Sequence, residues 1–528
     1  MAREIQTRWK VTGILTAETP IHIGGIGGDA DTDLALAVNG CGNYYIPGTS
    51  LAGALRDWMK RSYDETTINN IWGFQKQDNG HASFIIVDDA EIILNNMTLE
   101  IREGVGINRR TGAAADEAKY SRAILPKGVK FPLSITLDIG KKENQNLDAF
   151  WHLIQALEQG DIRIGAAKTR GLGKVKLQHI KIQKHDWSTP KTLFDSLLKQ
   201  NLKRKWAEIK QGLEDYNPQR LSLEITWNPQ DSVMVKAEGD GIAVDILPLV
   251  SQVTGNVHFV IPGSSIKGVL RSHAERIVRT VCNLSTRERF LKQVQLNLVD
   301  EVFGAAENSN GSQHQGKMGA LSVDDCYAKI SMTAKNWSAV ENAAKSDKDE
   351  FSSFKKVLKT AILSPNSTEN PFQTLQPAMH VAVDRWTGGA ADGMLYSVLE
   401  PIAVDWGQIG INLDLARLQT YENCKNQNKK EGEDREMCVQ PAIALLLLVL
   451  RDFANRKLPI GYGTNRGMGT VEVTEMSFNC SPIEGLAGID QVRAIAPDLP
   501  NLGLSHDLLN LLNSAWKKWI EQHNKKGL

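Results

Sequence analysis

The chain carries the same series of sequence blocks twice, and this duplication restricts its fold more than any other feature. The blocks recur in the same order, and their paired ranges are 45–56 with 260–271, 72–89 with 303–325, 107–112 with 383–388, and 164–175 with 460–471. The spacing between matched residues grows along the chain: Pro262 follows Pro47 by 215 residues, whereas Arg466 follows Arg170 by 296. A spacing that only grows indicates one duplicated ancestral unit, with insertions accumulating in the second copy.

The remaining segments predict how the copies are connected. Residues 305–316 and 423–436 are polar insertions with the composition of surface loops. Residues 184–219 place apolar side chains on one face of a helix among Lys and Arg, which predicts a basic helical linker. Ser505 is a good N-cap for a tail helix that docks on the second copy or on a partner. The predicted organisation is a first domain over 1–183, the linker over 184–219, a second domain over 220–478 and a helical tail over 479–528.

Within each copy the hydrophobic pattern reads strand, helix, two strands, helix, strand. In the first copy the predicted strands are 9–16, 83–94, 99–107 and 173–182, and the predicted helices are 50–61 and 148–158. In the second copy the predicted strands are 220–227, 321–330 and 470–476, and the predicted helices are 265–278 and 441–455. This order is the ferredoxin-like plan, so the predicted fold class is α+β with two tandem ferredoxin-like domains.

Composition limits the classes of function. The 528 residues include 61 basic and 61 acidic side chains, so any nucleic-acid binding must come from local patches. The longest apolar run, 442–450, is about half the length that a membrane-spanning helix needs. No apolar segment of a secretion signal follows the N-terminal charges, so we expect a cytoplasmic protein without membrane contact. Six cysteines without a Cys-x-x-Cys pair argue against a disulfide framework and a zinc knuckle.

The first repeated block joins a turn to the start of a helix. It reads Ile-Pro-Gly and then hydroxyl residues, which suit a helix N-terminus whose N–H groups and dipole face a phosphate. Its candidate contacts are Gly48, Ser50 and Arg56 in the first copy, and Ser264, Ser265, Lys267 and Arg271 in the second. Lys267 favours the phosphate interpretation, whereas Ala52 at the matching place does not. A well-capped helix without a ligand is the alternative.

The last repeated block is a glycine-rich loop. Glycines allow close backbone approach, and the loops add Lys168 and Arg170 in the first copy and Arg466 in the second. Neither loop is a Walker motif, because no Gly-Lys-Ser/Thr follows. A structural turn remains the alternative.

The block at 107–112 and its match at 383–388 each end an extended segment and run into small residues. This pattern predicts a protruding hairpin that wedges between nucleotides, with Arg109 and Arg385 at matching positions. A plain surface hairpin is the alternative.

A glycine-led acidic loop precedes the Ile-Pro-Gly block in each copy, at 27–33 and at 239–245. One carboxylate cannot enclose a magnesium ion, but a carboxylate and substrate phosphates together usually hold one. A solvated acidic loop is the alternative. His22 and His380 are candidates for phosphate contact or acid–base chemistry, although a lone histidine is more often structural.

Taken together, His22-Ile23-Gly24-Gly25, the paired Ile-Pro-Gly blocks, the Asp-Arg-x-Thr-Gly block and the glycine-rich loops resemble the RAMP superfamily of CRISPR-associated proteins. More narrowly, they resemble backbone subunits of type III RNA-guided effector complexes, here two subunits fused head to tail. The resemblance implies an RRM-like fold in each copy, a palm that grips guide RNA and a thumb hairpin that displaces one nucleotide at regular intervals. It implies CRISPR guide RNA, complementary target RNA and other effector-complex subunits as partners.

The resemblance also implies an active site. In the family the catalytic residue is an aspartate in the loop before Ile-Pro-Gly, followed shortly by a proline. Asp245 and Pro248 match this pattern, and Asp33 matches in position but lacks the proline. We therefore expect Asp33 and Asp245 to be catalytic and metal-binding, with Asp31 and Asp240 in reserve and Mg²⁺ or Mn²⁺ as cofactor.

The expected activity is target-RNA cleavage at two regularly spaced sites, one per copy. The implied RNA contacts are His22, Gly48, Ser50, Arg56, Arg109, Lys168, Arg170, Ser264, Ser265, Lys267, Arg271, Arg385 and Arg466. The second copy departs from the pattern at 231–235, where the first has its His-Ile-Gly-Gly loop.

Other functions fit some of these patterns. A non-catalytic backbone scaffold would share every block except a working aspartate. A guide-processing endoribonuclease would use a histidine-centred site without metal, and the duplicated Ile-Pro-Gly blocks argue against it. An enzyme with a dinucleotide cofactor is remote, because no Gly-x-Gly-x-x-Gly follows a first strand.

Overall fold

The computed structural model describes residues 4–25, 32–76, 79–94, 97–140, 147–198, 202–214, 218–239, 241–285, 290–305, 316–343, 354, 356–358, 360, 374–419, 439–480, 489, 492–495 and 502–524. The chain forms two compact units. Unit 1 consists of residues 1–102, 120–168 and 172–218, and unit 2 consists of residues 103–119, 169–171 and 219–528. Unit 2 therefore includes two short segments of the first sequence copy.

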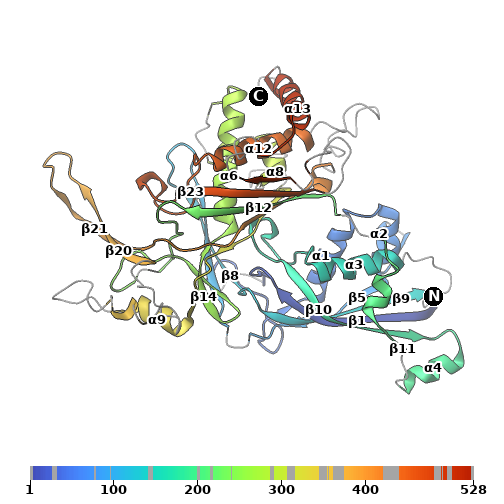
Figure 1. The fold of residues 1–528 in the computed structure, drawn as a ribbon. Helices are drawn as coiled ribbons and strands as arrows, with labels where there is room; N and C mark the ends of the chain where they lie inside the picture. The colour runs from blue at the N-terminus through green and yellow to red at the C-terminus, as the bar shows by residue number, and fades with distance from the viewer. Residues whose placement is uncertain are drawn as a thin grey trace. The chain divides into compact units, whose positions relative to one another are not determined.

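Unit 1 is built on an antiparallel sheet in the order β11-β10-β1-β9-β5. Its strands are β1 (Ile5–Ala17), β5 (Ile85–Val87), β9 (Lys130–Gly140), β10 (Val175–Asp186) and β11 (Leu202–Arg204). Helices α1 (Gly48–Met59) and α3 (Leu147–Gln159) pack on this sheet (Figure 1). The apolar side chains of sheet and helices, among them Phe131 and Phe150, form one buried core.

Unit 2 repeats the plan with the sheet order β17-β22-β12-β23-β24. Its strands are β12 (Arg220–Pro229), β17 (Leu321–Val323), β22 (Ile409–Asp414), β23 (Val471–Cys480) and β24 (Arg493–Ile495). The helices that match α1 and α3 are α6 (Gly263–Val281) and α12 (Val439–Ala454), and they belong to the buried core of this unit.

The two sheets share one topology. With β1, β5, β9 and β10 numbered as strands one to four, the spatial order is 4-1-3-2, and β12, β17, β22 and β23 repeat it. One helix follows strand one and another follows strand three. This is the ferredoxin-like arrangement, so the predicted fold class is confirmed.

Shorter elements complete the units. In the first copy they are β2 (Tyr45–Ile46), α2 (Glu65–Trp72), β3 (Phe74–Lys76), β4 (Asn79–His81), β6 (Ala90–Glu91), β7 (Glu100–Ile107), β8 (Ala114–Ile124), η1 (Lys168–Arg170), α4 (Pro190–Leu197) and α5 (Trp206–Lys210). In the second copy they are β13 (Val250–Val253), β14 (Asn256–Ile261), α7 (Phe290–Gln293), α8 (Val299–Phe303), β15 (Gly304–Ala305), β16 (Lys317–Met318), β18 (Cys326–Tyr327), β19 (Met332–Thr333), α9 (Ala334–Glu341), β20 (Leu375–Val383), β21 (Ala390–Pro401), η3 (Thr464–Arg466) and α13 (His506–Asn524).

One predicted strand has a different role. Residues 99–107 form β7, which pairs with β8 as a separate hairpin, whereas the third strand of the first sheet is β9. The sequence analysis missed β9. Pro132 lies inside this strand, and a proline argues against a central strand unless it falls near the strand's beginning, as it does here.

The segment predicted as a helical linker is not one continuous helix. It begins within β10 and contains α4, β11 and α5, and β11 extends the first sheet by pairing with β10. Phe194 and Leu198, which the helix pattern placed on its one apolar face, are 63% and 68% exposed. The pairing of β11 with β10 therefore determines the structure of this part of the segment, although its apolar residues have helical spacing.

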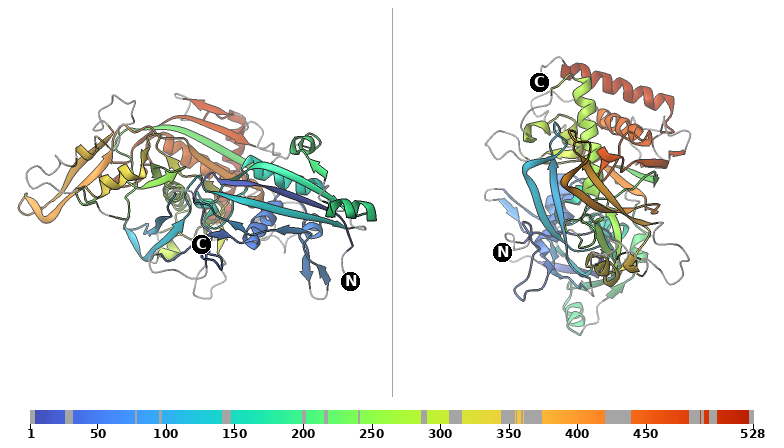
Figure 2. Two further views of the ribbon diagram at one scale, coloured as in Figure 1. Left: turned by 90° about the horizontal axis from the view of Figure 1, so that it is seen from below. Right: turned by 90° about the vertical axis from the view of Figure 1, so that its left-hand side faces the viewer.

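The predicted tail helix is present as α13 and packs on α12 (Figure 2). The N–H of Leu508 donates to Oγ of Ser505, as expected of an N-cap. Leu508, Leu512, Trp516 and Trp519 are buried at this contact face. The tail thus docks on the second copy.

Candidate active-site carboxylates and nucleic-acid interface

Asp33 lies in a loop of unit 1 and is paired with one serine, Ser121, on β8. Its Oδ2 accepts from the backbone N–H of Ser121 at 2.7 Å and from the hydroxyl at 3.0 Å. The same hydroxyl accepts from the N–H of Asp33 at 3.0 Å. These hydrogen bonds from Ser121 lower the pKa of the exposed Asp33 carboxyl, which therefore stays ionised at neutral pH.

Asp245 makes the same arrangement in unit 2 with Ser397 on β21. Its Oδ2 accepts from the N–H of Ser397 at 2.7 Å and from the hydroxyl at 2.8 Å, and the N–H of Asp245 donates back to that hydroxyl at 3.0 Å. The next residues, Leu34 and Ile246, continue the match, because each bridges in parallel to the strand residue after the serine. The two copies thus place the two predicted catalytic aspartates in one geometry.

The sequence analysis missed the two serines, although a signal for them exists. The dipeptide Tyr120-Ser121 returns as Tyr396-Ser397, 276 residues later, which is the spacing of the hairpin blocks. The reserve candidates Asp31 and Asp240 lie outside the described residues.

The fit of a divalent cation depends on the donor set at each aspartate. Among the described residues no group of three or more His, Cys, Asp and Glu side chains forms a metal cage. One ionised carboxylate suits Mg²⁺ or Mn²⁺ only when the other ligands are water and substrate phosphate. Asp33 and Asp245 fit such a shared cation, not a site built by protein alone.

The glycine-rich loops of the two copies have the same backbone. Gly165 and Gly461 have φ angles of +76° and +91°, and the residue after each donates its N–H to a carbonyl of an earlier loop. The accepting carbonyl belongs to His22 in unit 1, at 2.9 Å, and to Met234 in unit 2, at 2.7 Å. Met234 therefore occupies the place of His22, which confirms that the second copy lacks this histidine.

His22 is buried and does not act as a cation. Its Nδ1 lies 2.7 Å from the carbonyl oxygen of Ala123, and burial lowers its pKa. A neutral His22 is a structural group here, not an acid–base residue facing solvent. His380, on the other copy's hairpin, contacts Glu400 through Nε2 at 3.0 Å and stacks on Tyr396.

The helix N-termini of the Ile-Pro-Gly blocks already bind carboxylates. Asp89 accepts from the N–H of Gly48 at 2.6 Å, and Asp325 accepts from the N–H of Gly263 at 2.8 Å. The expected hydroxyl caps are absent from α1 and α6, whose N-cap residues are prolines without a side-chain cap. A carboxylate at the positive end of the helix dipole disfavours a phosphate there, so the N–H groups of Gly48 and Gly263 are satisfied within the protein.

The side chains of these blocks divide by exposure. Ser50 and Ser264 are exposed and Ser265 is half-buried, so they remain candidate contacts. Lys267 is 6% exposed and donates from Nζ to the carbonyl of Leu321 at 2.7 Å, and burial lowers its pKa well below the ordinary value. Lys267 is therefore paired within the protein in this structure, and its role as an RNA contact stays a prediction.

Other predicted cations also have protein partners. Arg56 is half-buried and donates to Asn69 at 3.4 Å. Nζ of Lys168 lies 3.5 Å from Oδ2 of Asp57. Arg170, at the end of η1, is exposed.

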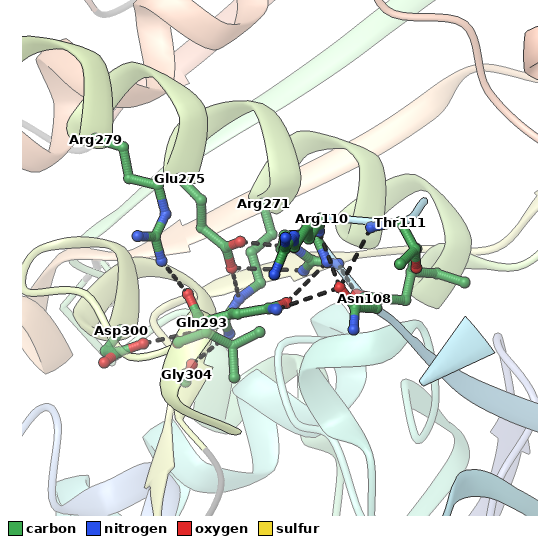
Figure 3. Close-up of polar contacts among 12 residues, drawn as sticks. Asn108, Arg110, Thr111, Arg271, Glu275, Arg279, Gln293, Asp300 and Gly304 are labelled. Atoms are coloured by element: carbon green, nitrogen blue, oxygen red, sulfur yellow. Dashed lines mark hydrogen bonds and ion pairs between the residues drawn. The ribbon is translucent and has the colours of Figure 1, made fainter. Parts of the chain in front are cut away.

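Arg271 contacts the buried Glu275 within unit 2 (Figure 3), and Arg109 binds the same carboxylate. Oε2 of Glu275 accepts from Nε of Arg109 at 2.6 Å, and Oε1 accepts from Nε of Arg271 at 2.7 Å. Gln293, which is fully buried, accepts the backbone N–H of Arg109 at 2.9 Å and donates to Asn108 at 3.2 Å. Arg109 thus holds the tip of the β7–β8 hairpin on α6, and Arg271, which lies on α6 itself, is paired with the same carboxylate.

Asp300 joins this cluster through Arg271, at 3.0 Å. Burial raises the pKa of Asp300 to about 6, although the Arg271 guanidinium opposes the shift. Folding raises the pKa of Asp300, so this carboxyl favours the folded state most below its unfolded pKa near 4. Its contribution to the free energy of unfolding falls as pH rises through about 6.

Asp300→Asn should therefore remove the decrease in stability that ionisation of Asp300 causes at higher pH. The variant is expected to be more stable than wild type by about 2–3 kcal/mol at pH 8, with the difference vanishing towards pH 4. Thermal unfolding from pH 4 to 8 measures it, and Asp57→Asn, at a more exposed acid, is the control. A difference independent of pH would contradict the assignment.

The two hairpin tips have one backbone conformation. The side chains of Asn108 and Asp384 accept the N–H groups two and three residues later, and Gly112 and Gly388 have φ angles of +70° and +72°. The second strand of each hairpin also contains a left-handed residue at the same place: Gly393 (φ +70°) follows Glu117 (φ +56°) by 276 residues.

The β20–β21 hairpin extends from the rest of unit 2 (Figures 1 and 2). Trp386 at its tip is 96% exposed and Arg385 beside it is exposed. At the other end of the hairpin, Arg466 of the glycine-rich loop lies over the rings of Tyr396 and Tyr462, 5.6 and 6.0 Å from their centroids. This combination of exposed cations and aromatic rings suits unstacked nucleotides.

Comparison with known proteins agrees with this geometry. The model of the RAMP superfamily matches residues 14–176 and 248–472, which is one segment in each copy. No curated protein matches the chain. Among the described residues no helix is long and apolar enough to cross a membrane. The duplicated ferredoxin-like sheets, the paired glycine-rich loops and the family match over most of the sequence lead to one conclusion: the chain belongs to the RAMP superfamily and contains two of its domains.

Proposed function

We propose that the chain is a backbone subunit of a type III CRISPR effector complex that holds guide RNA and cleaves the paired target RNA at two positions. The observation that carries this proposal is the pair of matching aspartates, Asp33 and Asp245, each fixed by one serine at the same place in a RAMP domain. A scaffold would not need two copies of an oriented carboxylate.

The proposed reaction uses the target's own 2′-hydroxyl. When a nucleotide is displaced from the duplex, its 2′-oxygen can line up with the adjacent phosphorus, and attack breaks the bond to the 5′-oxygen of the next nucleotide. A bound divalent cation would stabilise the charge on the phosphate oxygens. Asp33 and Asp245 would supply the ionised oxygens that hold this cation at the phosphate. The 2′-hydroxyl gives its proton to solvent, and the leaving 5′-oxygen takes one up. The products are a 2′,3′-cyclic phosphate and a free 5′-hydroxyl, so DNA, which lacks the 2′-hydroxyl, resists cleavage.

The other parts of each copy have supporting roles. The hairpins displace nucleotides, with the exposed Trp386 at one tip as a wedge. At the other tip Arg109 is docked on α6, and the exposed Arg110 and Thr111 beside it take this role. The glycine-rich loops approach the RNA backbone closely, and Arg170 and Arg466 supply positive charge there. Base pairing between guide and target supplies the sequence specificity, which leaves the protein to read the shape of the duplex.

Asp33→Ala and Asp245→Ala are each expected to abolish one of the two cuts, lowering its rate by at least about 10³-fold. The reason is that the oriented carboxylate at the reacting phosphate is lost. The assay uses the complex assembled with guide RNA and an end-labelled complementary RNA, with Mg²⁺ or with EDTA. Asp507→Ala, at an exposed acid on the tail helix α13, is the control.

The pattern of cuts decides between functions. One cut lost per substitution, both lost in the double variant and unchanged target binding support the proposal. Persistence of both cuts in the double variant would make the chain a scaffold. Loss of both cuts from one substitution would contradict the two-site arrangement.

A further inference from the structure

We infer, on the basis of the proposed function, that Ser121 and Ser397 are positioning residues that fix each aspartate to the hairpin strand of its own copy. Ser121 lies on β8 and Ser397 on β21, the second strands of the two hairpins. Each serine therefore links the element that displaces a nucleotide with the carboxylate beside the bond to be cut.

The serine hydroxyl both accepts a hydrogen bond from the aspartate and donates one to it. In unit 1 it accepts from the N–H of Asp33 at 3.0 Å and donates to Oδ2 at 3.0 Å, and in unit 2 the corresponding distances to Asp245 are 3.0 and 2.8 Å. The serine N–H adds a third bond to the same Oδ2, at 2.7 Å in both units. Both donors thus converge on one carboxylate oxygen, which restricts rotation about the terminal bond of the aspartate.

Backbone pairing holds the loop on both sides of this contact. The N–H of Leu34 donates to the carbonyl of Ser121, and the N–H of Ala123 donates to the carbonyl of Leu34. In unit 2 Ile246 makes the same two bonds, with Ser397 and Leu399. A shift of the hairpin strand would therefore carry the aspartate with it.

Core packing does not explain the pair. Asp33 and its hydrogen bonds to Ser121 are exposed, where a hydrogen bond contributes little to stability, whereas Ser397 is only 3% exposed. Burial is therefore not what the two serines share. The surrounding residues differ between the copies: Arg122 follows the serine in one and Val398 in the other. The aspartate, the serine and the tyrosine before it are kept in both copies, as expected if the orientation of the carboxylate is what matters.

The test replaces each serine by alanine and by threonine in the complex assembled with guide RNA. Ser397→Ala removes the hydroxyl but keeps the N–H bond, and we expect the cut assigned to Asp245 to slow about 10- to 100-fold. The cut should also spread to neighbouring phosphates, because the carboxylate is no longer held in one orientation. Ser397→Thr restores the hydroxyl and should cut at the wild-type position within about threefold, since threonine is compatible with a strand.

Each chain contains its own control, because the other copy is unchanged. Ser397→Ala should leave the cut assigned to Asp33 at its wild-type rate, and Ser121→Ala should do the reverse. Amide hydrogen exchange supplies a readout that needs neither metal nor substrate. In Ser397→Ala the segment 241–249 should exchange faster, while the segment around Asp33 should not change.

The outcomes separate this inference from the proposed function. If the aspartate variants lose their cuts but the alanine variants of the serines keep wild-type rates, positions and exchange, the positioning role is wrong and the nuclease stands. If Ser397→Ala slows both cuts or weakens target binding, the serine is a folding residue and the inference is overturned. If the aspartate variants keep their cuts, the proposed function fails and the inference fails with it.

Discussion

Gly461→Ala is expected to destabilise unit 2 by about 4 kcal/mol or more, one of the largest effects of any single methyl group in the chain. A Cβ at this position would lie 2.2 Å from the carbonyl oxygen of Met234, and the φ angle is +91°. The carbonyl cannot move away easily, because it accepts the N–H of Tyr462 at 2.7 Å. The substitution therefore breaks the contact that joins the glycine-rich loop to the 231–235 loop.

Gly467→Ala is the matched control within the same loop. Its φ angle is +87°, but no atom lies within 4 Å of the added Cβ, so only the conformational cost of about 1 kcal/mol remains. Thermal unfolding of the two variants measures the difference. Equal losses in both would show that backbone strain alone, and not the close approach to Met234, requires glycine.

Glu275→Lys is expected to detach the β7–β8 hairpin from α6. The substitution removes the acceptor of Arg109 and Arg271 and adds a third cation at a site where the glutamate is 1% exposed. Breaking a buried ion pair while leaving its partner charges buried costs about 3–5 kcal/mol. We expect a lower thermal midpoint and rapid proteolysis within residues 103–119.

Glu275→Gln is the control variant that keeps the size and shape of the side chain and removes its charge. Glutamine keeps an oxygen that accepts one of the two guanidinium donors, so the hairpin should stay docked with a smaller loss of stability. If Glu275→Lys leaves the hairpin as resistant to protease as wild type, Gln293 and the surrounding apolar contacts hold it without the charge.

The duplication made most of the fold predictable. Matched blocks required two copies of one topology, and the left-handed glycines of the loops follow from their sequence, since residues such as Gly165 and Gly461 are kept at positions where a Cβ meets a carbonyl. The tail helix followed from its N-cap and apolar spacing. These features are local or periodic, and a sequence shows such features directly.

Contacts between distant segments were not predictable in the same way. Lys267, Arg271 and Glu275 follow one another at intervals of four residues, which indicates one helix face but not whether that face meets RNA or protein. Gln293 lies on a short helix of the second copy and is far in sequence from the hairpin that it holds. Asp89 and Asp325 end one pair of the repeated blocks, yet nothing local shows that they reach the N-termini of α1 and α6.

The tip of each hairpin is separated from its serine by the same length of chain. Ser121 follows Thr111 by ten residues, Ser397 follows Thr387 by ten, and both strands contain their left-handed residue at the sixth step. The strand part of this segment, from Ala114 to Ser121 and from Ala390 to Ser397, is seven steps long and spans at most about 23 Å. Each hairpin therefore has a fixed length. The number of residues between its tip and its serine, not the rest of the fold, determines the distance along the RNA between the wedge and the carboxylate.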